Sequence, residues 1–269
     1  MKIARVLSEN RRLYAASQDG KRFFEIRGSL LHSWEVSDTE VFPERLLAPV
    51  DPVQILAVGV NYRAHAEEMG SAFPEYPVIF MKGVGSLLDP DQAIRIPEYL
   101  GSDQVDYEVE LAVLIGRTCK NVTEDQALDY VLGYTVANDV TARDWQKRWG
   151  GGQWCRAKSF DTFCPVGPWL VTPDEIPDPN ALNLCSRVNG EVRQNSSTAD
   201  MIFKVSRLIS FLSGSTTLPA GTLILTGTPP GVGMAMNPPR YLVPGDRVEV
   251  EISGIGVLAN PVEWESTTS

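Results

Sequence analysis

An apolar run at residues 111–115, with acidic residues before it, constrains the fold more than any other part of this 269-residue chain. Both faces of the run are apolar, which is typical of a strand covered on both sides. Glu108 and Glu110 precede the run, and in an extended strand their side chains point to the same face. Two adjacent carboxylates at the head of a buried strand repel each other and resist leaving water. A hard divalent cation relieves both costs, and Asp139, which closes the next apolar stretch, would supply a third oxygen ligand.

A second acidic pair near the C-terminus supplies the alternative interpretation. Glu249 and Glu251 have the same spacing, but they alternate strictly with apolar residues after a turn at 244–246. That pattern is typical of a hairpin strand with one face in water. A Glu-x-Glu pair alone is therefore weak evidence. The residues by themselves leave both a metal site and a solvated strand face open for Glu108 and Glu110.

Composition and charge exclude several classes of protein. The chain is 43% hydrophobic and 22% charged, and its apolar runs are too short to cross a membrane. The formal net charge is −10 and no block of lysines or arginines is present, which argues against nucleic acid and anionic membranes as partners. Four cysteines without a CxxC spacing argue against zinc and disulfides. The first residues contain no apolar secretory signal, so we expect a protein of the cytoplasm or of an organelle matrix such as that of mitochondria.

The pattern along the chain predicts two domains of unequal size. Residues 1–48 alternate and predict a small N-terminal β-rich domain, and residues 49–269 form one larger domain after a proline-containing linker. Two amphipathic patterns predict helices over residues 123–132 and 199–212. Most other segments are short, β-branched and separated by Gly or Pro. We therefore predict an α+β, strand-dominated fold, a mixed sheet or roll with few helices.

Several polar residues stand where catalytic groups are useful. His65 follows an apolar strand, and on a helix it would share one face with Glu68. A carboxylate beside an imidazole fixes its tautomer and raises its basicity, although an ordinary surface helix can carry the same pair. Arg143 and Gln146 follow Asp139 and would face one side of a helical or turn-like continuation.

Lys158 and Thr228 lie in segments of a different character. Lys158 stands in a stretch with few other charges, and Thr228 stands in a Gly- and Pro-rich turn that suits a small anion. Neither this turn nor residues 83–85 carries the rest of a nucleotide-binding fingerprint, so we expect no NAD or nucleotide chemistry.

These segments together resemble the fumarylacetoacetate hydrolase family, most closely its FAHD2-like and acylpyruvate hydrolase-type members. The matching blocks, which occur in the order found in the family and extend over about residues 50–262, are GVNYRAHAEE, PVIFMKG, VDYEVELAVLIG, GYTVANDVTARDWQ, RAKSFDTFCPVGPWLVT and ILTGTPPGVG. The resemblance implies a mixed β-roll or β-sandwich core of the family's C-terminal type. It also implies a homodimer and a bound Mg²⁺ or Mn²⁺ ion.

The resemblance assigns roles to residues by their position. The metal ligands correspond to Glu108, Glu110 and Asp139. The pair that activates water in hydrolytic members corresponds to His65 and Glu68, and the lysine that stabilises a developing enolate corresponds to Lys158. The positions that contact substrate correspond to Arg143, Gln146 and Thr228. Lys82 is a further candidate contributor.

We therefore predict a divalent-metal-dependent hydrolase that cleaves a carbon–carbon bond in a 2,4-diketo acid of the acylpyruvate or fumarylpyruvate type. The cation would act as a Lewis acid that stabilises enolate character, while water prepared by His65 attacks the distal carbonyl. Alternatives at the same site are tautomerisation or decarboxylation of oxaloacetate, and isomerisation of a 2-hydroxy-dienoate from aromatic degradation. A metal- or anion-binding protein without activity is disfavoured, because Lys158 and His65 accompany the three acids.

Overall fold

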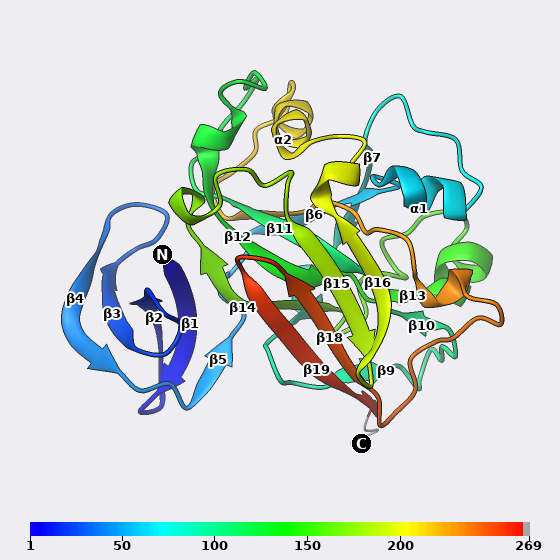
Figure 1. Ribbon diagram of the computed structural model, residues 1–269, viewed down its shortest axis with the longest axis horizontal. Helices are drawn as coiled ribbons and strands as arrows, with labels where there is room; N and C mark the ends of the chain where they lie inside the picture. Colours follow the sequence, from blue (N-terminus) through cyan, green and yellow to red (C-terminus); the bar gives the residue numbers. More distant parts are fainter. Residues whose placement is uncertain (266–269) are drawn as a thin grey trace.

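Most strands belong to one large mixed sheet. The structure, a computed structural model, describes residues 1–265, and its strand-dominated architecture confirms the predicted α+β class (Figure 1). In spatial order the 12-stranded sheet contains β4 (Trp34–Val41), β3 (Phe23–Gly28), β2 (Arg11–Ser17), β1 (Lys2–Ser8), β14 (Cys164–Val171), β12 (Val131–Asn138), β11 (Val109–Ile115), β17 (Thr222–Leu225), β6 (Gln54–Gly59) and β7 (Val78–Lys82). Two short strands lie beside this path, β5 (Arg45–Leu47) on β1 and β8 (Leu87–Leu88) on β14.

Two smaller sheets and a few helices complete the fold. The five-stranded sheet contains, in order, β16 (Glu191–Ser197), β15 (Asn183–Val188), β18 (Arg247–Ile252), β19 (Gly256–Trp264) and β9 (Ile94–Ile96). A two-stranded sheet pairs β10 (Val105–Asp106) with β13 (Thr141–Ala142). The helices are α1 (Arg63–Glu68), α2 (Val205–Ser213), a π-helix at Trp145–Trp149 and short 3-10 helices at Val84–Ser86, Ala127–Tyr130, Pro173–Glu175, Thr198–Asp200 and Gly233–Ala235. None of the helices within residues 1–265 has the length and apolar character needed to cross a membrane.

The N-terminal strands extend the large sheet at one side of the molecule. Figure 1 shows β1–β4 at the left, away from the five-stranded sheet. Strand β1 pairs antiparallel with β14, so that Ile3 lies opposite Leu170. The predicted division of the chain into residues 1–48 and 49–269 stays a prediction.

Strand β11 lies at the centre of the large sheet and has both faces covered. Leu111 and Val113 belong to the core that the large sheet shares with the five-stranded sheet. Ala112 and Leu114 point the other way, into a second core. Every residue of β11 is buried, as expected from a run that is apolar on both faces. Polar groups at the head of this strand are thus carried into the interior.

The helix predicted over residues 123–132 is wrong. Thr123 and Gln126 do form a side-chain hydrogen bond of 3.0 Å, but only a 3-10 helix at Ala127–Tyr130 follows. Strand β12 begins at Val131, which pairs with Ile115 of β11. Sheet pairing of the apolar residues therefore overrides their helical spacing.

The helix predicted over residues 199–212 is present only in its second half. A 3-10 helix at Thr198–Asp200 precedes α2, which begins at Val205. The side chain of buried Asn61 accepts a hydrogen bond of 2.8 Å from the backbone N–H of Phe203. The same side chain donates a hydrogen bond of 3.1 Å to the backbone carbonyl of Phe203. These two bonds hold the chain before α2 outside the helical conformation.

Candidate active site

The register of β11 and β12 brings two of the predicted acids together. Val109 pairs with Asn138, which places Asp139 beside Glu108 at the end of the ladder. The Asp139 N–H donates to the Glu108 carbonyl at 2.9 Å, and the Glu108 N–H donates to Asn138 Oδ1 at 2.9 Å. Glu110 lies two residues along the same strand face. One carboxylate oxygen from each acid lies within 4.8 Å of the others, and all three residues are buried.

Buried cations surround two of the three acids. Lys158 Nζ lies 2.6 Å from Glu108 Oε2 and also contacts Asp139. Lys82, at the end of β7, lies 2.6 Å from the other Asp139 oxygen. Burial acts to raise the pKa of Glu108, but Lys158 and then Arg143 lower it to about 2. Glu108 therefore remains ionised at neutral pH although it is inside the protein.

Glu110 differs from its neighbours because it has no cationic partner within residues 1–265. Its carboxylate accepts a hydrogen bond of 2.7 Å from the Gly227 N–H. Burial, followed by the charges of Asp139 and Glu108, raises the pKa of Glu110 well above its ordinary value. A buried carboxylate with neighbouring acids and no protein cation is a position that a metal cation suits.

Arg143 is held from two sides. Its Nε donates to Asp106 Oδ2 at 2.8 Å, and its Nη1 donates to Gln146 Oε1 at 3.0 Å. Gln146 belongs to the π-helix Trp145–Trp149, and π-helical turns are frequent at functional sites. Arg143 Nη2 lies 2.7 Å from Glu108 Oε1 but lacks hydrogen-bonding geometry to any group described. The arginine is thus held by two buried carboxylates, and it also lines the cavity.

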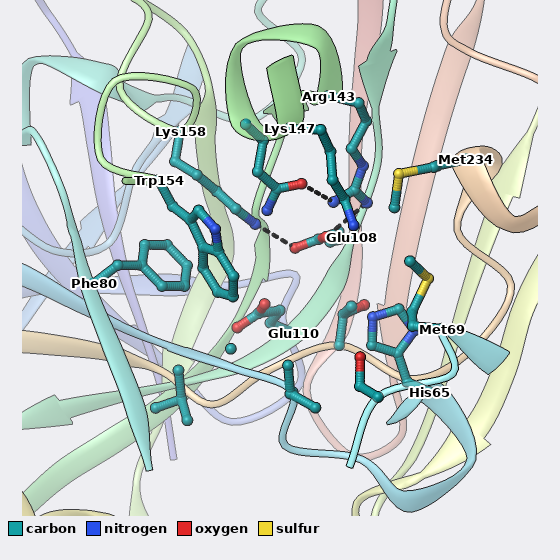
Figure 2. Close-up of a pocket in the computed structure, with 16 residues that line it drawn as sticks. His65, Met69, Phe80, Glu108, Glu110, Arg143, Lys147, Trp154, Lys158 and Met234 are labelled. Carbon is teal, nitrogen blue, oxygen red and sulfur yellow. Dashed lines mark hydrogen bonds and ion pairs between the residues drawn. The ribbon is translucent and has the colours of Figure 1, made fainter. Parts of the chain in front are cut away.

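His65 and Glu68 form the pair expected from their spacing. Both lie on α1, and His65 Nδ1 is 3.0 Å from Glu68 Oε2. The other Glu68 oxygen accepts from the Gly231 N–H at 2.9 Å, which fixes the carboxylate. Figure 2 shows His65 on the opposite side of the pocket from Lys158. With Nδ1 engaged, Nε2 is the ring nitrogen available to a ligand.

The predicted residues share one small cavity of about 130 Å³. Drug-sized ligands occupy pockets of roughly 300–1,000 Å³, so this cavity suits a molecule of a few carbon atoms. Thr228 lines the cavity, but its hydroxyl donates to the Val109 carbonyl at 3.0 Å and accepts from Gln194. Asp139, Lys82 and Glu68 are not part of the lining and act from behind it. The roles assigned to all these residues stay predictions.

Sequence reasoning missed much of the wall of the cavity. The additional lining side chains with apolar or cationic character include Met69, Phe80, Lys147, Trp154 and Met234 (Figure 2). Phe80 and Trp154 pack edge to face with ring centroids 5.5 Å apart, although they come from β7 and from a distant loop. No spacing in the sequence could have revealed that contact. Lys147 follows Gln146 directly, but adjacent residues on a helix do not share a face, so this adjacency does not predict its position.

Three buried carboxylates beside a small pocket, within a strand-dominated fold, offer the oxygen ligands that hard divalent cations prefer. The chain belongs to the fumarylacetoacetate hydrolase family: the sequence profile described as "Fumarylacetoacetate (FAA) hydrolase C-terminal" matches residues 54–263. Enzymes of this family generally depend on a divalent metal. Membership confirms the predicted family and core type.

Named relatives and solved structures include tautomerases, isomerases and hydrolases. Oxaloacetate tautomerase fahd2, mitochondrial, of Xenopus laevis is 50% identical over 218 residues, which cover 81% of this chain and 68% of that protein. The structure of 5-carboxymethyl-2-hydroxymuconate delta-isomerase from Mycobacterium smegmatis has a TM-score of 0.86 and 39% identity, covering 98% of this chain and 100% of that one. Fumarylacetoacetate hydrolase from Exiguobacterium antarcticum has a TM-score of 0.89 and 39% identity, with the same coverage. The expected homodimer and cellular location stay predictions.

Proposed function

We propose that the protein catalyses keto–enol tautomerisation of oxaloacetate or a closely similar 2-keto acid, with a divalent cation. The observation that carries this proposal is the placement of an acidic cluster with Lys158 and Arg143 on one wall, facing His65 across the cavity. The names of the relatives support tautomerisation better than the carbon–carbon cleavage that the sequence first favoured.

The three acids fit a Mg²⁺ or Mn²⁺ ion. Glu108, Glu110 and Asp139 offer only carboxylate oxygens, the donors that these hard cations prefer. The missing protein counter-charge at Glu110 is the specific feature of this structure that a cation would complete. When bound, the ion supplies Lewis acidity to a keto oxygen.

Charge in the rest of the pocket favours an anionic substrate. Lys82 and Lys158 neutralise much of the acidic cluster, and Arg143 is paired with Asp106 and Glu108. Addition of a dication to this set gives a local excess of positive charge. Arg143 and Lys158 line the cavity, and their cationic side chains favour binding of the 2-keto carboxylate at its inner end.

Proton transfer is carried out by His65, on the opposite wall of the cavity. His65 Nε2, the ring nitrogen not engaged by Glu68, removes the proton from the carbon next to the ketone. The C–H electron pair forms the carbon–carbon double bond, and the carbonyl pair moves onto oxygen near Lys158. The His65 imidazolium then gives this proton to that oxygen, which completes the enol and regenerates the neutral imidazole, and the reverse sequence returns the ketone. Glu68 stabilises the imidazolium that exists between the two steps.

A second candidate function is hydrolysis of acylpyruvates. The His65–Glu68 pair favours it, because a base with an orienting carboxylate can equally deprotonate a water molecule. That water would attack the distal carbonyl, and the enolate of pyruvate would depart from the same wall of the pocket. The two functions use the same residues and differ in whether water enters.

The test is a pair of spectrophotometric assays on purified protein with Mg²⁺. We expect rapid loss of enol-oxaloacetate absorbance and slow or no cleavage of acetylpyruvate, and we expect EDTA to abolish turnover. His65→Asn should reduce kcat by about 10²- to 10⁴-fold. His32→Asn, which changes the other histidine of the chain on an exposed turn, is the matched control and should leave kcat unchanged. Fast acetylpyruvate cleavage without tautomerisation would replace the first function by the second.

A further inference from the structure

We propose that Lys147 selects dicarboxylate substrates by binding their second carboxylate at the mouth of the cavity. This inference rests on the proposed function only for the placement of the 2-keto end of the ligand. The acidic cluster, Lys158 and Arg143 would bind the 2-keto end of the ligand. Lys147 would bind the other end, at the mouth of the cavity.

The cavity has an inner end and a mouth with different character. Glu108, Arg143 and Lys158 lie at the inner end and are buried. Lys147 and Ser71 also line the cavity but are exposed, so they mark its mouth. Figure 2 shows the Lys147 side chain extending toward Glu108 among the other side chains that line the cavity.

Lys147 is the lining cation that has no anionic partner within residues 1–265. Lys158 is paired with Glu108 and Asp139, and Arg143 is paired with Asp106 and Glu108. The charge of Lys147 is therefore available to a ligand. An ammonium that carries no internal ion pair yet points into a pocket is suited to bind an incoming carboxylate.

The backbone directly before Lys147 is held by several hydrogen bonds. The preceding Gln146 holds Arg143 at 3.0 Å, and the Trp145 indole donates to the Gly101 carbonyl at 3.0 Å. Asp144 accepts from the Trp145 N–H at 2.8 Å and so caps the π-helix. These contacts position the backbone of Lys147 relative to Arg143. They thereby limit the separation of the two cations that would bind the two ends of a diacid.

The Ser71, Met69 and Met234 side chains near the mouth carry no charge. Met69 and Met234 are half-buried and present thioether and methylene groups to the cavity. They suit the carbon chain of any short keto acid and distinguish poorly between ligands. Discrimination between a charged and a neutral tail therefore falls to Lys147.

Calorimetric titration with two ligands that share the same 2-keto acid head tests this role. Oxaloacetate carries a second carboxylate and pyruvate does not, so each is titrated into Mg²⁺-loaded protein. We expect Lys147→Met to weaken oxaloacetate binding about tenfold, the range of one charge-assisted hydrogen bond, and to change pyruvate binding less than twofold. Lys147→Glu should weaken oxaloacetate further, and Lys147→Arg should restore most of the affinity.

The matched control is Arg148→Met, which removes a neighbouring cation that stacks on Trp149 and does not line the cavity. It should change neither affinity. Equal weakening of both ligands by Lys147→Met, or no weakening of either, overturns the inference. A wild-type protein that binds both ligands equally also overturns it, even if tautomerisation is fast. Loss of tail discrimination in Lys147→Met, in a protein that shows no tautomerisation, supports the inference and rejects the proposed function.

Discussion

Two Glu-x-Glu pairs with identical spacing differ in burial: one pair lies inside the protein, and the other lies partly exposed on its surface. Glu108 and Glu110, at the head of β11, are 5% and 1% exposed. Glu249 and Glu251, on β18, remain partly exposed to water. Glu251 forms an ion pair of 2.8 Å with Arg187, and both side chains of this pair are about one-third exposed. The spacing sets only which face the acids share. What covers that face decides whether they form a charged centre or an ordinary strand surface.

The neighbours of each strand explain the difference. Strand β11 lies between β12 and β17 and carries apolar cores on both faces, whereas β18 buries only its apolar residues Val248, Val250 and Ile252. The cations beside the first pair, Lys158 and Arg143, are buried, whereas Arg187 beside Glu251 is partly exposed. Burial thus turns a repelling pair of acids into a site that requires cations.

The largest expected contrast is in metal affinity. Glu110→Gln removes a buried oxygen ligand, and even loss of a supporting residue around a metal typically costs 10- to 100-fold in affinity. We therefore expect Mn²⁺ affinity to fall by more than about 100-fold and turnover to be lost. Glu251→Gln should leave both unchanged, and equal losses in calorimetry would break the comparison.

The free energy of unfolding should depend more on Lys82, which pairs with Asp139 in the buried acidic cluster, than on Arg187, which pairs with Glu251. Lys82→Met leaves the buried Asp139 with less compensation, and removal of one partner from a buried pair costs about 3 kcal/mol or more. Arg187→Met breaks a partly exposed pair, which contributes about 1 kcal/mol or less. Urea unfolding in EDTA measures both, and a cost for Arg187→Met as large as that for Lys82→Met would contradict the account.

The third expected contrast is in thermal stabilisation by the cation. At a free Mn²⁺ concentration 100 times Kd, binding adds about 2.7 kcal/mol to the free energy of unfolding. For a chain of this size that corresponds to roughly 5–10 °C in Tm. Scanning calorimetry should show this shift in wild type and in Glu251→Gln, and its absence in Glu110→Gln. A full shift in Glu110→Gln would place the cation elsewhere.

The sequence predicted the buried strand and the shared face of its acids, because both follow from residue alternation alone. Asp139 was predicted as the third ligand, but its position beside Glu108 depends on the register between β11 and β12, which residue alternation does not supply. The helix over residues 123–132 was wrong for the same reason, because sheet pairing of Val131 decided its conformation.

Residues of the pocket were harder to predict than the acids. Lys82 was only a candidate, because its burial against Asp139 depends on the position of β7 at the sheet edge. Lys147 was overlooked because a lysine among polar residues is usually solvated, and only the π-helix turns it toward the cavity. The three-dimensional path of the chain determines which of these side chains reach the pocket, and residue type alone does not.

The central claim is that Glu108, Glu110 and Asp139 together bind one divalent cation. The most direct measurement is anomalous diffraction from crystals soaked in Mn²⁺. The account predicts a single strong peak bonded to one oxygen of each of the three acids, and no peak beside Glu249 and Glu251. An absent peak at the three acids, or one bonded only to the β18 pair, would contradict it.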